Sequence, residues 1–89
     1  MIYTVDYFIT KFEAIPIYKW TRNWFQNETN QCDALGHCGV TGPWEIEDTP
    51  EAVALINLFA DHGLDISMVN DLSDEHPKVA VLNALRGMK

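Results

Sequence analysis

Proline positions constrain the fold of this 89-residue chain more than any other single feature. A proline stops or kinks a helix that runs into it, but it fits well at the first position of a new helix. Pro16 therefore ends one helical segment, whereas Pro50 and Pro77 stand where new helices begin. The pattern predicts a mostly α fold, in the form of a small α+β domain, with main helices at about residues 4–15, 50–62 and 77–87.

Apolar residues repeat with helical spacing in each of these three segments. Thr4 and Thr49 directly precede the first and second segments, where a hydroxyl can cap the free amides of a helix. Gly63 is suited to end the second helix because glycine readily adopts a left-handed backbone conformation. The stripe of the first segment consists of Val5, Phe8, Ile9, Phe12 and Ile15.

The middle of the chain, residues 20–48, carries weaker signals. Its Thr, Trp and Phe residues favour extended backbone, and the Asn-Glu-Thr-Asn sequence that follows them is typical of a turn. We therefore expect a small hairpin near residues 21–32 and a short helix near residues 32–38. Residues 64–69 fit either a short helix or an extended segment.

Length and composition predict a single domain, residues 1–89, in which 47% of the residues are hydrophobic. Thirteen acidic residues outnumber six Lys and Arg, which gives a net charge of −7. Because Lys and Arg neutralise phosphates, this balance argues against a nucleic-acid partner, whereas it favours solubility or a basic partner. The sequence has no long apolar stretch and no basic leader, so we expect a cytoplasmic protein without a membrane partner.

The two cysteines, Cys32 and Cys38, are expected to be free thiols because no secretory signal precedes them. A structural zinc site usually has four ligands in closely spaced pairs. Here the cysteines are six positions apart, and His37 is too close to Cys38 for both to face one ion. Distant His62 or His76 would have to complete the set, so we predict no metal and no cofactor.

Cys32 is also a candidate catalytic nucleophile. It lies near the expected start of the short helix, and a helix N-terminus can lower the pKa of a thiol. His37, His62 or His76 is the candidate base, and Asn70 or Asp71 the candidate orienting group, by analogy with catalytic triads. Cysteine is among the most commonly buried residue types, so a structural thiol and a non-enzymatic protein are the preferred interpretation.

The tryptophans and an Asn-Asp pair are candidate binding residues. An exposed tryptophan can anchor a partner, although such side chains also complete small cores. An Asn-Asp pair after a short apolar segment usually caps a helix or turn, but it can also hold a ligand. The candidates are Trp20, Trp24, Trp44, Asn70 and Asp71.

One motif, Cys-x-Ala-Leu-Gly at residues 32–36, is followed later by Asn-Asp at residues 70–71. Together with Lys-Phe-Glu-Ala-Ile-Pro at residues 11–16, it resembles a family of small uncharacterised proteins of bacteriophages, prophages and bacteria. The resemblance covers nearly the whole chain, but Asp33 stands where members often have a second cysteine, and Leu72 where they often have glycine. It implies a phage or gut-bacterial origin and an intracellular setting, without an activity.

These features favour a small acidic interaction module, such as a phage accessory protein that binds a host protein or a small molecule. The alternative is a thiol-dependent enzyme with Cys32 as nucleophile and a histidine base. A lowered pKa of the Cys32 thiol would favour the enzyme, since only the thiolate is a strong nucleophile.

Overall fold

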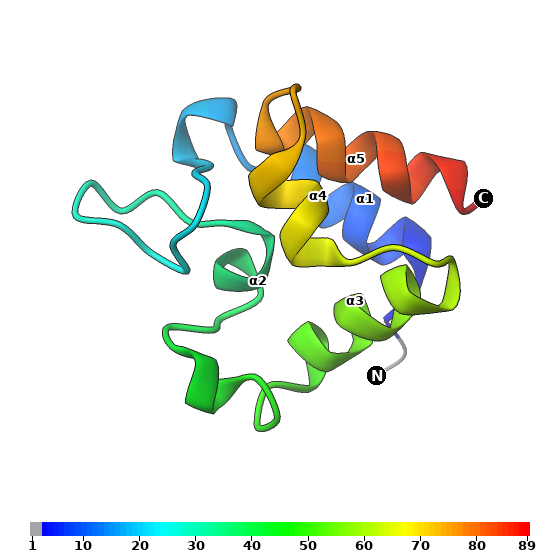
Figure 1. Ribbon diagram of the computed structural model, residues 1–89, viewed down its shortest axis with the longest axis horizontal. Coiled ribbons are helices and arrows are strands. Elements are labelled where there is room, and N and C mark those ends of the chain that lie inside the picture. Colours follow the sequence, from blue (N-terminus) through cyan, green and yellow to red (C-terminus); the bar gives the residue numbers. More distant parts are fainter. Residues whose placement is uncertain (1–2) are drawn as a thin grey trace.

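The computed structural model describes residues 3–89 and consists of short helices joined by loops (Figure 1). The predicted mostly α fold is confirmed. All three main helices form within one or two residues of the predicted ends. The elements are α1 (Val5–Glu13), η1 (Ile17–Lys19), α2 (Ala34–His37), η2 (Pro43–Glu45), α3 (Pro50–Asp61), α4 (Ile66–Leu72) and α5 (Pro77–Gly87), where η denotes a 3-10 helix.

Helix α4 connects the parts of the fold, because it packs against α2, α3 and α5. Helices α1 and α5 form a second contact, and in Figure 1 they lie close together on the side away from the long loop before α2. Each fully buried large apolar side chain stabilises such a fold by about 1.5–3 kcal/mol. Apart from Val40, which follows α2, the largest of them come from α1, α3 and α5: Phe8, Phe12, Leu55, Phe59, Val81 and Leu85.

The structure confirms two of the predicted helix-end residues and contradicts a third. Thr4 caps α1 as predicted, since its Oγ1 accepts a hydrogen bond from the backbone N–H of Tyr7 at 3.1 Å. Gly63 follows α3 with a φ of 73°, in the left-handed region that favours glycine. Thr49 precedes α3 but makes no side-chain cap, because its hydroxyl donates to the carbonyl oxygen of Glu45 at 2.8 Å. The predicted Thr49 cap is therefore wrong.

The hairpin expected near residues 21–32 does not form. Within the described chain, extended pairing is limited to one isolated parallel bridge between Trp20 and Cys32. Asn23 and Asn30 adopt positive φ values of 66° and 62°, which turn the backbone away from the extended conformation a strand requires. The residues between the two ends of the bridge form a loop, and the strand propensity of Thr, Trp and Phe is overridden.

Helix α4 forms in a segment for which the sequence allowed either a short helix or extended backbone. Asp65 begins the helix, since its Oδ1 accepts hydrogen bonds from the N–H groups of Ser67 at 2.9 Å and Met68 at 3.2 Å. The carboxylate also lies at the positive end of the helix dipole. The short helix expected near residues 32–38 forms as α2 but is only four residues long.

No single helix within residues 3–89 is long and apolar enough to cross a membrane. Helices α3 and α4 reach that length and composition only when taken together, and they meet at a bend of 86°. The buried face of α3 packs in the core, through Ala52, Leu55 and Phe59.

Candidate functional site

The buried side chain of Asn70 links segments that lie far apart in the sequence. Only 1% of this residue is exposed. Its Oδ1 accepts a hydrogen bond from the N–H of Ala34 at 3.1 Å, while its Nδ2 donates to the carbonyl oxygen of Thr21 at 3.1 Å and to Asp71 Oδ1 at 2.8 Å. Ala34 is the first residue of α2, so its N–H has no partner within that helix. Asn70 therefore caps α2 from across the fold.

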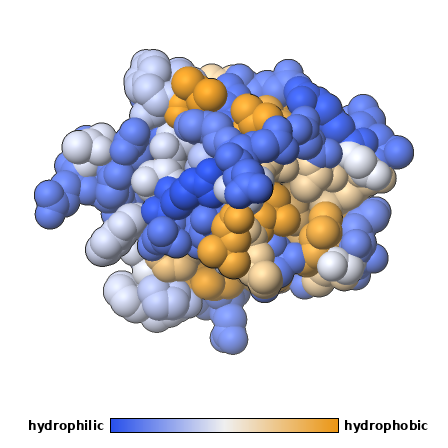
Figure 2. Space-filling view, turned by 45° about the horizontal axis from the view of Figure 1, so that its top comes forward, coloured by the Kyte–Doolittle hydropathy of each residue, from blue (hydrophilic) through white to orange (hydrophobic). Residues whose placement is uncertain are grey.

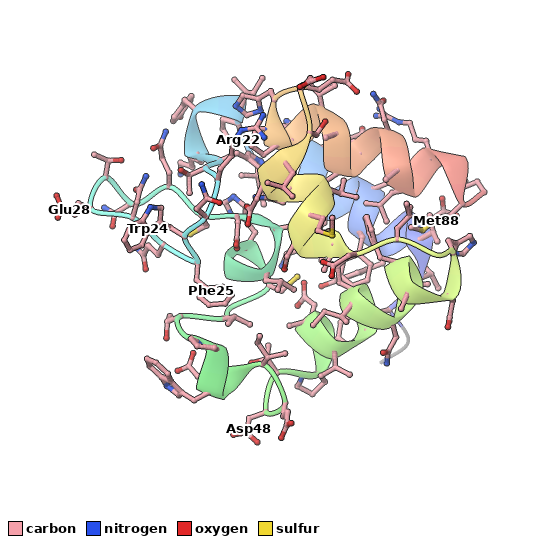
Figure 3. All side chains as sticks on the ribbon, in the orientation of Figure 1. Arg22, Trp24, Phe25, Glu28, Asp48 and Met88 are labelled. Carbon is pink, nitrogen blue, oxygen red and sulfur yellow. The ribbon has the colours of Figure 1, made fainter. Side chains whose placement is uncertain are left out.

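Asp71 and Arg22 complete this arrangement. The same Asp71 Oδ1 accepts the backbone N–H of Asn23 at 2.8 Å. The Arg22 guanidinium donates to the carbonyl oxygens of Asp71 at 3.0 Å, of Asn70 at 3.5 Å, and of Glu75. Figure 3 shows Arg22 beside the end of α4, where the carbonyls of Asn70 and Asp71 lie at the negative end of the helix dipole. We call Arg22, Asn70 and Asp71 the polar clamp.

A close backbone contact holds the same loop against α2. A Cβ atom at Gly36 would lie 1.8 Å from the carbonyl oxygen of Phe25, so only glycine fits there. Asp33 caps α2 by accepting the N–H of Gly36 at 2.7 Å, and its own N–H donates to the carbonyl oxygen of Trp24 at 3.2 Å. Burial raises the pKa of Asp33 to about 6, with a further contribution from the Asp71 carboxylate, while the bond from Gly36 opposes the shift.

The tip of the loop is ordered by its own polar side chains. Asn27 Oδ1 accepts the N–H groups of Thr29 at 3.0 Å and Gln31 at 2.9 Å. The Gln31 side-chain amide in turn donates to the carbonyl oxygen of Tyr18 at 2.8 Å, which attaches the tip to η1. We call residues 21–31 the Trp24 loop. Its shape is set by hydrogen bonds more than by core packing.

The three candidate tryptophans lie in different environments. Trp20 is 3% exposed and packs edge-on against Phe12, with ring centroids 5.2 Å apart. Trp44 is 76% exposed, and its ring covers the backbone at Gly42. Trp24 is 63% exposed and projects from its loop (Figure 3). Trp24 and Trp44 can therefore contact a partner directly, whereas the buried Trp20 and Asn70 can act only by positioning other residues.

Trp24 forms one wall of a shallow hollow of about 350 Å³. The other walls are short polar or acidic side chains of the same loop, so an apolar ring lies beside several hydrogen-bonding groups. This combination suits a contact that buries the indole ring and leaves a polar rim. The lining residues are Trp24, Gln26, Asn27, Glu28 and Thr29.

The candidate nucleophile lacks the signs of an activated thiol. Cys32 and Cys38 are free thiols, the first half-buried and the second buried. Burial raises the pKa of Cys32, and the Asp33 carboxylate raises it further, whereas activation requires a lowered pKa. Burial raises the pKa of Cys38 to about 12, and Glu51 adds to the effect. Neither thiol is therefore poised to form a thiolate at neutral pH.

His37 is held as a neutral imidazole in the interior. Its ring lies against Trp20, with centroids 4.6 Å apart, and burial lowers its pKa to about 4. No group of three His, Cys, Asp or Glu side chains within residues 3–89 is arranged to hold a metal ion. Asp71 faces Asn23 and Asn70 and has no hydrogen bond to His37, so the residues proposed for a triad do not assemble into one in the described chain.

A second surface was not identified from the sequence. Leu64, Met68 and Leu72 are exposed and lie beside a groove next to the start of α5. Their spacing of four residues is typical of one face of a helix. The sequence did not decide whether this segment is helical, so the spacing alone did not indicate a surface. Once α4 is known to be a helix, this spacing places Met68 and Leu72 on one face, and Leu64, just before the helix, lines the same groove.

Comparisons with protein-family models, with curated proteins and with solved structures find no match to this chain. Its function is therefore inferred from the arrangement of its own residues.

Proposed function

We propose that this chain is a small acidic interaction module that binds a partner protein through the Trp24 loop. The observation that carries the proposal is the 63% exposure of Trp24 on a loop fixed by the polar clamp. Tryptophan is enriched among residues that dominate the energy of protein interfaces. An exposed tryptophan on an ordered loop is a suitable anchor for a partner.

The order of the loop supports this proposal independently. Binding is weakened by the entropy lost when a flexible segment becomes fixed, and a segment already fixed avoids that loss. Here Asn70 and Asp71 hold the start of the loop, while Asn27 holds its tip. The loop is thus preorganised, although it contributes little to the apolar core.

The resemblance to phage and prophage proteins leads us to propose a bacterial host protein as the partner and the host cytoplasm as the compartment. A small molecule is the alternative ligand, since the hollow beside Trp24 has a volume of about 350 Å³. A partner protein is favoured because the hollow is shallow and Trp24 is the only apolar residue among those that line it. A small ligand usually needs a more enclosed, mostly apolar cavity.

The proposal is tested by capturing proteins from a bacterial lysate with the immobilised chain and with Trp24→Ala. Because Trp24 is mostly exposed, its replacement should leave the fold intact and remove the captured partner. Trp44→Ala is the matched control, since that ring is equally accessible but lies on another loop. Equal capture by the parent and Trp24→Ala would refute the proposal. A small molecule recovered from the parent alone would favour the alternative ligand.

A further inference from the structure

Three exposed apolar side chains form a row along α4 and the residues just before it. Leu64 is 39% exposed, Met68 57% and Leu72 69%. Single exposed apolar residues are ordinary on protein surfaces, but contiguous ones mark contact sites more often. Asp65 and Asp71, which belong to the same segment, have polar roles and lie outside this row.

This row forms one side of a groove of about 460 Å³ between α4 and the start of α5. Figure 2 shows an apolar area near the middle of the visible face, bordered by hydrophilic residues, in the region where Figure 1 places α4. We call this feature the α4 groove. It is lined by Gly63, Leu64, Asp65, Met68, Val69, Leu72, Ser73, Glu75 and Ala80.

The charges at the α4 groove are acidic. Asp65 and Glu75 line it, and Asp74 is exposed in the adjoining linker. None of these three carboxylates is in an ion pair within residues 3–89, where Lys11, Arg86 and Lys89 pair with other acids. Arg22 lies nearby, but its guanidinium is already bound to the carbonyl oxygens of Asp71, in α4, and of Glu75, in the linker that follows.

We propose that the α4 groove binds a short amphipathic helix of another protein, with an apolar stripe flanked by Lys or Arg. The apolar row supplies the contact that a helix-in-groove complex requires, and the unpaired carboxylates match basic flanks. Helix α4 has seven residues and is about 10 Å long, so it matches about two turns of a partner helix. A second copy of this chain is a poor occupant because its own net charge is −7.

This site is separate from the Trp24 loop and does not depend on the function proposed above. The test uses a fluorescent 14-residue peptide with leucines at helical spacing and lysines on its other positions, measured by anisotropy at low and at physiological salt. We expect binding that weakens as salt increases, since exposed charges are screened. The Met68→Asn/Leu72→Asn double variant should lose about tenfold or more in affinity.

The matched control is Ile17→Asn, which replaces an equally exposed apolar residue on η1 and should bind the peptide as the parent does. A peptide with glutamate in place of lysine should not bind. The proposal is overturned if the double variant binds as tightly as the parent, or if the glutamate peptide binds equally well. It is also overturned if the parent forms a dimer that the double variant abolishes, since the groove would then bind a second copy. None of these three outcomes affects the interpretation of the Trp24 test.

Discussion

The α1–α5 pair and the Trp24 loop are ordered by different forces. The pair is held by fully buried apolar side chains, such as Phe12 and Leu85. The loop is held by hydrogen bonds with the side chains of Asn70 and Asp71, about 48 residues further along the chain. Its own Arg22 donates to backbone carbonyls of the same region. Apolar packing has no direction and is shared among many contacts, whereas each hydrogen bond depends on one geometry.

The difference predicts two kinds of response to substitution. Loss of a core side chain should weaken the whole domain, because every helix shares the same core. Loss of a clamp residue should weaken the domain less and release the loop first, since local opening requires less free energy than global unfolding. The substitutions below test this division.

The largest effect is expected in the core. Phe12→Ala should lower the free energy of unfolding by about 4 kcal/mol, because it removes a fully buried ring and leaves a cavity. Chemical denaturation followed by circular dichroism measures the loss. Ile17→Ala, at a half-exposed position, is the control and should change the free energy by about 0.5 kcal/mol or less. Equal losses in the two variants would contradict the assignment of the core.

The clamp should give the next largest effect. Asn70→Ala leaves the N–H of Ala34 and the carbonyl of Thr21 without their partner, which should cost about 3 kcal/mol. Hydrogen exchange should accelerate at Ala34 well before it does in α5. The exposed Asn83→Ala variant is the control and should leave both quantities nearly unchanged. Uniform acceleration across the domain would show that the loop and the helices open together.

A backbone contact provides a third test. Gly36→Ala places a Cβ against the carbonyl oxygen of Phe25, so the loop must move away from α2, at a cost of about 2 kcal/mol. Limited proteolysis should then cut the Trp24 loop faster. Gly87→Ala is the matched control: its Cβ would meet nothing within 4 Å, so it should stabilise α5 by about 0.5 kcal/mol or more. Unchanged proteolysis in Gly36→Ala would refute the close contact.

The buried Asp33 and the half-buried His37 should give the domain's stability opposite dependences on pH. The folded state raises the pKa of Asp33 from 3.8 to about 6, so it holds a proton that the unfolded chain has lost, and stability falls as pH rises through this range. The folded state lowers the pKa of His37 from 6.5 to about 4, so the unfolded chain takes up the proton first, and stability falls as pH drops through this range. In the parent, these two pH-dependent contributions to the free energy of unfolding largely cancel.

Single replacements should separate these contributions. Relative to the parent, Asp33→Asn should gain about 2 kcal/mol as pH rises from 4 to 6, while asparagine keeps the cap of α2. His37→Gln should instead gain relative stability, by about the same amount, as pH falls from 6.5 to 4. Thermal unfolding of each variant between pH 4 and 6.5, compared with the parent at each pH, measures both changes in stability. A difference from the parent that does not vary with pH would exclude the corresponding shift.

The helical core could be predicted from sequence because its signals are local. Pro50, Pro77 and the apolar spacing mark α3 and α5 directly in the sequence. The Trp24 loop could not be predicted in the same way, because its shape depends on residues distant in the chain. Nothing in the sequence near Thr21 shows that its carbonyl is bound by Asn70, so local propensity gave a hairpin there.

The candidate residues show the same division. Asn70 and Asp71 were recognised as polar groups with a capping tendency, but the helix that Asn70 caps is α2, which only the tertiary structure reveals. Trp24 was recognised as a possible anchor, whereas its exposure depends on where the loop is fixed. Met68 was missed as a surface residue because the helix on which it lies was itself not assigned.

The separation of the clamp from its loop also affects the order of events during synthesis. Arg22 and Asn23 are 49 and 48 positions before Asp71, so a growing chain contains the whole Trp24 loop long before it contains Asn70 and Asp71, which hold the start of the loop. We expect the loop to be disordered on any product that stops before α4. A partner that recognises the ordered loop would therefore bind chains that extend through α4 and ignore those that stop before it, so the ordered surface reports that α4 has been made.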